Sequence, residues 1–212
     1  MKLYGNPLSS ATIAVLATLA EKGHSAELVV VDLRKGEHKQ PAHLARHPFG
    51  VIPVLDDNGF LLYESRAIMR YLDGRLPGPR LVPDDLRQRA LMEQWISVEQ
   101  SYFSPAVGRI FYPLFMGQPP DPQALEKARA EVAQSLRVAE AALRERPYLT
   151  GDGLTLAELC WLPFLEMLGL VGQDDLIRQH PRVTDWWQRL RSRASWQKVL
   201  AQAPLPTGAP SA

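Results

Sequence analysis

The sequence lacks the features that mark several large classes of protein. It has a single cysteine, Cys160, among 212 residues, so an intrachain disulfide is excluded and stability must come from a hydrophobic core. No apolar run approaches the roughly 20 residues that span a bilayer, and the N-terminus has no basic segment leading into an apolar one. Lysine and arginine (24) nearly balance aspartate and glutamate (23), which argues against a nucleic-acid partner. These absences favour a globular protein of the cytoplasm that has no membrane partner.

Residues 1–76 alternate short strand and helix signals, which predicts an α/β domain. A short strand precedes a helical stretch that begins at Ser9 or Ser10, and a valine-rich strand follows. Two further apolar runs flank Asn58-Gly59, a dipeptide typical of tight hairpins. A helix capped by Ser65 completes the order strand–helix–strand, strand–strand–helix. This order is the one that a thioredoxin-like domain requires.

The rest of the chain is predicted to be helical. Residues 77–85 are rich in proline and glycine, as linkers are. Apolar side chains then recur at helical spacing, and Thr155 with Glu158 forms a capping box at the start of one helix. We therefore expect an all-α domain over residues 86–203 and a flexible tail over 204–212.

Four short motifs supply groups that suit one small acidic peptide. They are Asn-Pro-Leu-Ser-Ser, Gly-Glu-His-Lys, His-Pro-Phe-Gly-Val-Ile-Pro and Tyr-Glu-Ser-Arg, at residues 6–10, 36–39, 47–53 and 63–66. The second motif offers cationic side chains at His38 and Lys39, and the third offers a bare backbone edge beside Pro53. The fourth is a polar helix start at Glu64 and Ser65, whose free N–H groups suit a carboxylate.

These motifs, followed by a helical half, resemble the cytosolic glutathione S-transferases, and most of all their serine-type phi class. The resemblance covers essentially the whole chain. It implies a thioredoxin-like domain with a mixed four-stranded sheet, an all-α second domain, glutathione as co-substrate, no metal, and a homodimer. The implied activity is conjugation of glutathione to electrophilic, mostly apolar small molecules, as in detoxification, with reduction of organic hydroperoxides as a related activity.

The resemblance places the catalytic hydroxyl at Ser9, with Ser10 as the alternate. A free cysteinyl thiol such as that of glutathione has a pKa of about 8.5, so only a few per cent is thiolate at neutral pH. Lowering that pKa by about two units needs about 2.7 kcal/mol. One hydrogen bond to the anion supplies about 1.5–3 kcal/mol, so a single hydroxyl is sufficient. Read without the resemblance, either serine is equally typical of a simple helix cap.

The resemblance also assigns the residues that bind the peptide. The bond before Pro53 is expected to be cis, which turns the backbone of Ile52 toward the cysteinyl segment. The glycyl carboxylate is assigned to the cationic pair and the γ-glutamyl end to the polar helix start, which gives the set His38, Lys39, Val51, Ile52, Pro53, Glu64 and Ser65. Without the resemblance, the same residues read as solvated surface, an edge proline and a helix cap.

Val51 departs from the family pattern, which usually has glutamine at this position. Valine cannot donate the side-chain hydrogen bond that helps to hold the peptide. A neutral hydrogen bond contributes about 0.5–1.5 kcal/mol, so we expect glutathione to bind several-fold more weakly without being lost. His47 likewise stands where asparagine is more usual.

The second substrate is expected to meet apolar side chains from Leu8, Phe111, Tyr112 and Phe115. An aromatic stripe at helical spacing is also typical of a plain helical core, so this interpretation has a structural alternative. The ring of Phe49 has two interpretations as well, as a wedge into a partner subunit or as part of its own core.

Two other functions are open at this point. The first is a non-catalytic protein of the same fold that binds glutathione or apolar ligands. The second is a glutathione-dependent redox enzyme that uses a covalent cysteine. The loop at 6–12 has no cysteine, and Cys160 lies in the helical half within an apolar run, which argues against the second.

Overall fold

The computed structural model describes residues 1–118 and 120–202, and the flexible tail predicted for 204–212 lies outside them. The described residues form two compact units. The first comprises Met1–Leu81 together with the last helix, and the second comprises Val82–Arg193. Within the described stretches, no helix is long and apolar enough to cross a membrane.

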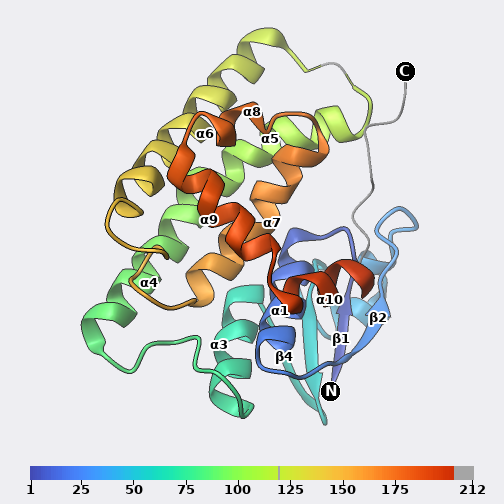
Figure 1. Cartoon of the computed structure of the whole chain (residues 1–212). Coiled ribbons are helices and arrows are strands. Elements are labelled where there is room, and N and C mark those ends of the chain that lie inside the picture. The colour runs from blue at the N-terminus through green and yellow to red at the C-terminus, as the bar shows by residue number, and fades with distance from the viewer. Residues whose placement is uncertain (119, 203–212) are drawn as a thin grey trace. The chain divides into compact units, whose positions relative to one another are not determined.

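The first unit is built on a four-stranded sheet (Figure 1). The strands lie in the order β2-β1-β3-β4, with β1 and β2 parallel and the other two pairings antiparallel. This is the mixed sheet of the predicted thioredoxin-like domain, so the fold prediction is confirmed for this half. In chain order its elements are β1 (Lys2–Gly5), α1 (Ser10–Glu21), β2 (Glu27–Val30), the 3₁₀ helix η1 (Glu37–Lys39), α2 (Pro41–Leu44), β3 (Val54–Asp57), β4 (Phe60–Tyr63), α3 (Ser65–Arg75) and α10 (Ala194–Gln202).

The hairpin between β3 and β4 turns at Asn58 and Gly59, as the sequence predicts. Both residues have positive φ, 55° and 92°, which a two-residue type I′ turn requires. Oδ1 of Asp56 accepts a hydrogen bond from the N–H of Gly59 at 2.8 Å and supports the turn.

The core of this unit lies between the sheet and its helices. Leu3 and Val54 of the sheet, Val15 of α1, and Ile68 and Leu72 of α3 have no exposed surface. Helix α1 packs against α3 and also against α10. This double contact explains why α1 is apolar on more than one face. The sequence analysis did not anticipate α10 as a separate helix.

A buried ion pair joins α1 to α3 and to the segment that follows α3. Nζ of Lys22 lies 3.0 Å from Oδ1 of Asp73 and donates to the carbonyls of Asp73 and Pro79, each at 3.0 Å. The same carboxylate oxygen accepts the N–H of Leu81 at 2.9 Å. The buried ammonium therefore has three acceptors, which offsets the cost of removing it from water.

The second unit is helical throughout its described residues, as predicted. The start of α7 carries the predicted capping box, in which Oε2 of Glu158 accepts the N–H and the hydroxyl of Thr155 at 2.8 and 2.7 Å. The elements are α4 (Leu86–Val98), the π-helical turn η2 (Glu99–Phe103), α5 (Ser104–Phe115), α6 (Pro122–Ala142), α7 (Leu156–Leu170), α8 (Asp175–Arg178) and α9 (Pro181–Arg191).

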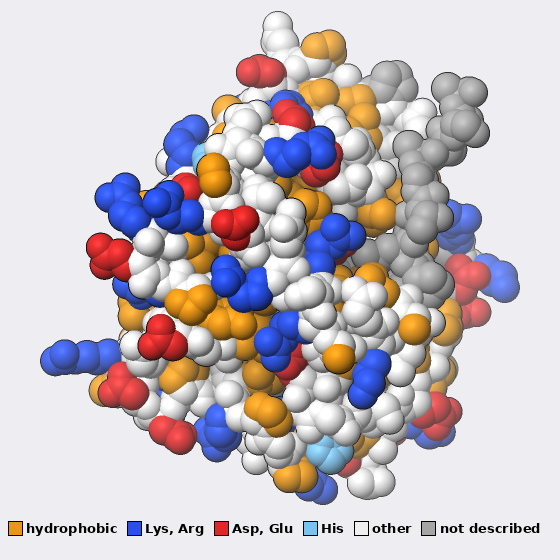
Figure 2. All heavy atoms as spheres, in the orientation of Figure 1, with side chains coloured by type: hydrophobic (Ala, Val, Ile, Leu, Met, Phe, Trp, Pro, Cys, Tyr) orange, Lys and Arg blue, Asp and Glu red, His pale blue; other side chains and the backbone are white. Residues whose placement is uncertain are grey.

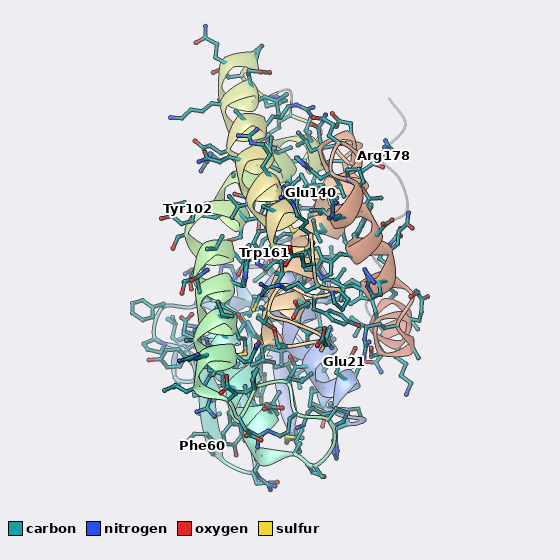
Figure 3. The ribbon with its side chains drawn as sticks, turned by 60° about the vertical axis from the view of Figure 1, so that its left-hand side comes forward. Glu21, Phe60, Tyr102, Glu140, Trp161 and Arg178 are labelled. Carbon is teal, nitrogen blue, oxygen red and sulfur yellow. The ribbon has the colours of Figure 1, made fainter. Side chains whose placement is uncertain are left out.

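Trp161 is the centre of the helical unit's core (Figure 3). Its ring stacks on Phe103 at 4.4 Å between centroids and meets Trp95 and Trp186 edge-on at 5.8 and 6.1 Å. Its indole N–H donates to the carbonyl of Trp95 at 3.1 Å. The neighbouring Cys160 is 3% exposed, which fits its interpretation as a small buried hydrophobe.

Charged side chains of both signs are mixed over the face that Figure 2 shows, in keeping with the net charge of +1.

Candidate functional site

Four segments of the first unit begin or end at one edge of the sheet. Tyr4 of β1 pairs with Val54 of β3, and Val54 pairs with Tyr63 of β4. The loop after β1, the segment before β3 and the junction after β4 therefore leave the sheet at the same edge. Gly5 lies opposite Val30 in the parallel pair, so the connection from β2 toward η1 starts there too. The register therefore brings the four predicted motifs to the same edge of the sheet.

Asn6 fixes the loop between β1 and α1. Its Nδ2 donates to the carbonyl of Val31 at 3.1 Å, and its Oδ1 accepts the N–H of Leu8 at 3.0 Å. Its own N–H donates to Oγ1 of Thr12 at 3.3 Å, and its carbonyl accepts the N–H of Ser9 at 2.9 Å. These four bonds hold the chain on both sides of the predicted catalytic serine.

Ser9 is the N-cap of α1, and Ser10 is the first residue of the helix; both are half-buried. Oγ of Ser9 accepts the N–H of Thr12 at 3.4 Å, which is long for such a bond. No described residue accepts a hydrogen bond from the Ser9 hydroxyl, so that proton is free for a ligand. The helix N-terminus adds partial positive charge at the same place. Capping and ligand binding are therefore compatible at Ser9.

The segment from Val51 to Pro53 has unpaired backbone groups. The Ile52–Pro53 bond is cis, as the resemblance implies. Among the residues that the structure describes, neither the N–H nor the C=O of Ile52 has a hydrogen-bond partner. The carbonyl of Val51 is occupied by Nε2 of His43 at 2.7 Å, while the Val51 side chain is 45% exposed.

The junction at Glu64 and Ser65 differs in detail from the prediction. Ser65 was expected to cap α3, but it is the first residue of the helix, and Glu64 occupies the N-cap position without a side-chain capping bond. Glu64 has φ 70° and ψ 108°, a conformation that residues with side chains rarely adopt. The Ser65 hydroxyl and N–H have no partner among the described residues, so both remain as unused donors at the helix N-terminus.

The cationic motif lies on η1 and packs against the loop before Val51. Nζ of Lys39 donates to the carbonyl of Phe49 at 3.0 Å. His38 is half-buried, and its Nδ1 is buried without a partner in the described part of the chain. A Cβ on Gly50, where φ is 58°, would lie 2.7 Å from the carbonyl oxygen of His38. Glycine is therefore required where the two segments touch.

Two buried histidines lie near this loop; the sequence analysis noted His47 only as a replacement for the more usual asparagine and gave no role to His43. His43 and His47 are 4% and 1% exposed. His47 stacks on Tyr63 with 4.4 Å between ring centroids. Burial lowers the pKa of His47; Glu64 opposes this effect, and His43 and Lys39 add to it. The only sequence signal was their spacing of four residues, on either side of the end of a four-residue helix.

The residues predicted for the second substrate fall into both units. Leu8 is 46% exposed in the loop before α1. Tyr112 of α5 is 60% exposed, whereas Phe111 is only 6% exposed and stacks on Phe115 at 4.9 Å. Phe111 therefore mainly packs the helical core, and Tyr112 and Phe115 offer the accessible rings of α5.

The helical unit also has a groove of about 780 Å³ that none of the predicted residues lines. Its walls include Val98 and Tyr102 before α5, Pro105 and Arg109 on α5, and Val138 on α6. Tyr102 is 66% exposed and lies on the outside of this unit, away from Trp161 (Figure 3).

Comparison with known proteins gives matches over both units. The family model for the glutathione S-transferase N-terminal domain matches residues 1–74, and that for the C-terminal domain matches 103–194. Glutathione S-transferase F10 of Arabidopsis thaliana is 42% identical over 208 residues, which cover 94% of this chain and 96% of that protein.

Solved structures agree with the sequence matches. Glutathione transferase F7 from Populus trichocarpa superimposes with a TM-score of 0.89 at 36% identity, covering 96% of this chain and 99% of its own. Glutathione S-transferase I from maize, solved with an atrazine glutathione conjugate, has a TM-score of 0.88 at 32% identity and covers 100% and 99%.

Proposed function

This chain belongs to the glutathione S-transferase family, and we propose that Ser9 activates glutathione for conjugation to electrophilic small molecules. The observation that carries the proposal is the free hydroxyl of Ser9 at the N-terminus of α1. The nucleophile is the thiolate, which is scarce at neutral pH for a thiol of pKa about 8.5. A hydrogen bond from the hydroxyl and the partial charge of the helix both stabilise the anion, so the pKa of the bound thiol falls.

The conjugation step needs no covalent bond to the protein. The bound thiol gives its proton to solvent, and the sulfur attacks an electrophilic carbon to form a carbon–sulfur bond. The leaving group departs with the bonding electrons, or, in an addition, the neighbouring atom takes up a proton. The protein binds and orients the peptide and stabilises the thiolate.

Unpaired groups at the sheet edge supply the other anchors for the peptide. The N–H and C=O of Ile52 pair with the cysteinyl backbone as an added strand. Ser65 and the N-terminus of α3 receive the γ-glutamyl carboxylate, and Glu64 pairs with the ammonium beside it. Lys39 and His38 take the glycyl carboxylate; the Lys39 ammonium keeps donors beyond its bond to the loop.

For the electrophile we retain Leu8, which is exposed next to the serine loop. Its apolar character suits the mostly apolar compounds named in the proposal.

We also propose that the chain works as a homodimer in the cytoplasm, as the cytosolic family resemblance implies. The first unit of one copy meets the helical unit of the other. Phe49 supports this arrangement, because its ring is 71% exposed and so does not pack the core of its own unit.

The test of Ser9 is the ultraviolet titration of the thiolate of bound glutathione in the wild type and in Ser9→Ala. We expect a thiol pKa well below 8.5 in the wild type. Ser9→Ala removes one hydrogen bond to an anion, so the pKa should rise by about one to two units and conjugation at neutral pH should fall about tenfold or more.

Two further variants separate catalysis from helix capping. Ser9→Gly keeps a residue that tolerates the N-cap position but has no hydroxyl, so it should lose activity as Ser9→Ala does. Ser10→Ala should leave the thiol pKa and the rate unchanged. A Ser10→Ala variant that raises the thiol pKa while Ser9→Ala does not would move the role to Ser10.

The alternative functions give different results in the same experiment. A non-catalytic binding protein would bind glutathione with an unshifted thiol pKa and turn over no electrophile. A cysteine-based redox enzyme would depend on Cys160, which is buried in α7 of the helical unit, and would lose activity in Cys160→Ala.

A further inference from the structure

The side chain of His43 makes one hydrogen bond within the described part of the chain. It lies in the short helix α2 and is 4% exposed, and its Nε2 is 2.7 Å from the carbonyl oxygen of Val51. A carbonyl oxygen only accepts, so Nε2 carries the proton and the imidazole donates. The bond reaches eight residues along the chain, to the residue before Ile52.

This bond sets the direction of a second group. The carbonyl of Val51 and the N–H of Ile52 belong to one planar trans peptide, in which they point in opposite directions. Holding the carbonyl toward the buried imidazole therefore turns the N–H outward. That N–H has no hydrogen-bond partner among the described residues, although its direction is fixed.

Backbone hydrogen bonds make the intervening loop stiff. The N–H of His47 donates to the carbonyl of His43 at 2.9 Å, and the N–H of Gly50 donates to the carbonyl of His47 at 2.8 Å. The imidazole of His43 closes the loop at its far end by reaching Val51. Among the described residues, this is the one hydrogen bond made by the peptide group between Val51 and Ile52.

We propose that His43 is a positioning residue for glutathione binding, which aims the N–H of Ile52 at the cysteinyl backbone of the ligand. The proposal rests on the proposed function, since it requires glutathione to pair with Ile52. It also gives the backbone carbonyl of Val51 a role that does not depend on the side chain at that position.

The test compares His43→Phe, His43→Gln and His47→Phe in the full chain. We would measure the glutathione dissociation constant by calorimetry, and KM, kcat and the thiol pKa by titration and turnover. His43→Phe keeps a ring without a donor, so the dissociation constant and KM should rise about three- to tenfold with kcat and the thiol pKa unchanged. His43→Gln offers an amide donor and should recover most of the affinity.

His47→Phe is the matched control, because it alters an equally buried imidazole of the same loop and keeps an aromatic ring to stack on Tyr63. It should leave glutathione affinity within about twofold of the wild type. Should circular dichroism show that His43→Phe is unfolded, the smaller donor-free His43→Leu takes its place.

The outcomes distinguish this inference from the proposed function. If the wild type binds and conjugates glutathione but His43→Phe binds it with unchanged affinity, the inference about His43 is overturned and the proposed function stands. Equal losses in the His43 and His47 variants, or a fall in kcat without a rise in KM, also overturn it. Wild type that binds without turnover overturns the catalytic proposal, and the affinities still decide the role of His43. Wild type that does not bind glutathione overturns both.

Discussion

At the scale of single residues, Val51 and Ile52 contribute backbone groups to the site rather than side chains. Ile52 contributes an N–H and a C=O, and Val51 contributes a carbonyl that His43 holds. The side chain of Val51 is 45% exposed and makes no hydrogen bond. A substitution at Val51 can therefore add an interaction without disturbing the one that its backbone already makes.

We expect Val51→Gln to strengthen glutathione binding. An amide side chain at this exposed position gains one neutral hydrogen bond to the peptide, about 0.5–1.5 kcal/mol, which corresponds to about a two- to tenfold lower dissociation constant. Calorimetric titration with glutathione measures the effect. Val51→Leu is the control, because it changes the size of the side chain but adds no donor. An unchanged dissociation constant in Val51→Gln would contradict the prediction.

Sequence signals are local, so they could identify Ser9 and Gly50 but not His43, whose hydrogen bond joins residues eight positions apart. Ser9 could be placed because a serine after a strand and before an apolar helical stretch marks a helix start. Gly50 stood in a recognisable run, although the reason for it, a carbonyl at 2.7 Å from its missing Cβ, needed coordinates. The role of His43 depends on a contact eight residues away, through an irregular loop that carries no period in sequence.

At the scale of elements, local signals predicted the helices well where the caps are made within a few residues. The capping box of Thr155 and Glu158 was predicted and is present, since it needs only residues three apart. Ser65 was misplaced by one position, because Glu64 adopts positive φ at the N-cap, which no sequence rule anticipates. Helix α10 was missed, because its role depends on packing against α1, far away in the chain.

We expect Glu158→Gln to destabilise the helical unit by about 1–3 kcal/mol. The carboxylate oxygens accept from the N–H of Leu149, the N–H of Thr155 and the hydroxyl of Thr155, all within 2.8 Å. Glutamine replaces one acceptor oxygen by an NH₂ group, which places a donor against buried donors. Urea unfolding of the full chain, followed by tryptophan fluorescence, measures the loss.

Glu158→Asp is the matched variant for this prediction. Aspartate keeps both acceptor oxygens but is one methylene shorter, so it can cap the helix through Thr155 while giving up the reach to Leu149. The loss should be smaller than for Glu158→Gln, roughly 1 kcal/mol. An equal or larger loss in Glu158→Asp would mean that side-chain volume, and not the set of acceptors, determines the stability of this junction.

At the scale of the whole molecule, the first compact unit is made of two stretches that are far apart in the sequence, Met1–Leu81 and the last helix. Helix α10 (Ala194–Gln202) returns to the first unit, where it packs against α1. The fold class was predictable, since strand and helix signals change character once along the chain. The return of α10 was not, because apolar helices of similar composition occur in both units.

The homodimer is the prediction that belongs to this scale. Phe49 is 71% exposed on the first unit, and the helical unit has a groove of about 780 Å³ whose walls combine apolar side chains such as Val98 and Val138 with charged ones such as Arg109. We expect the ring of one copy to be buried on the helical unit of another. A symmetric homodimer buries this ring twice, at about 1.5–3 kcal/mol each, so Phe49→Ser should raise the dimer dissociation constant by about a hundredfold or more.

Sedimentation equilibrium over a range of concentrations measures that constant for the wild type, Phe49→Ser and Leu33→Ser. Leu33 is the control because it is an apolar residue of the same unit, 40% exposed, on the connection between β2 and η1. Its replacement should leave the association unchanged, since exposed apolar residues outside an interface contribute little. A wild type that stays monomeric, or equal weakening by both substitutions, would refute the role of Phe49. Selective weakening by Phe49→Ser would show that the loop at residues 47–53 serves both dimerisation and glutathione binding. Phe49 directly precedes Gly50 and Val51, and its carbonyl accepts a hydrogen bond from Lys39.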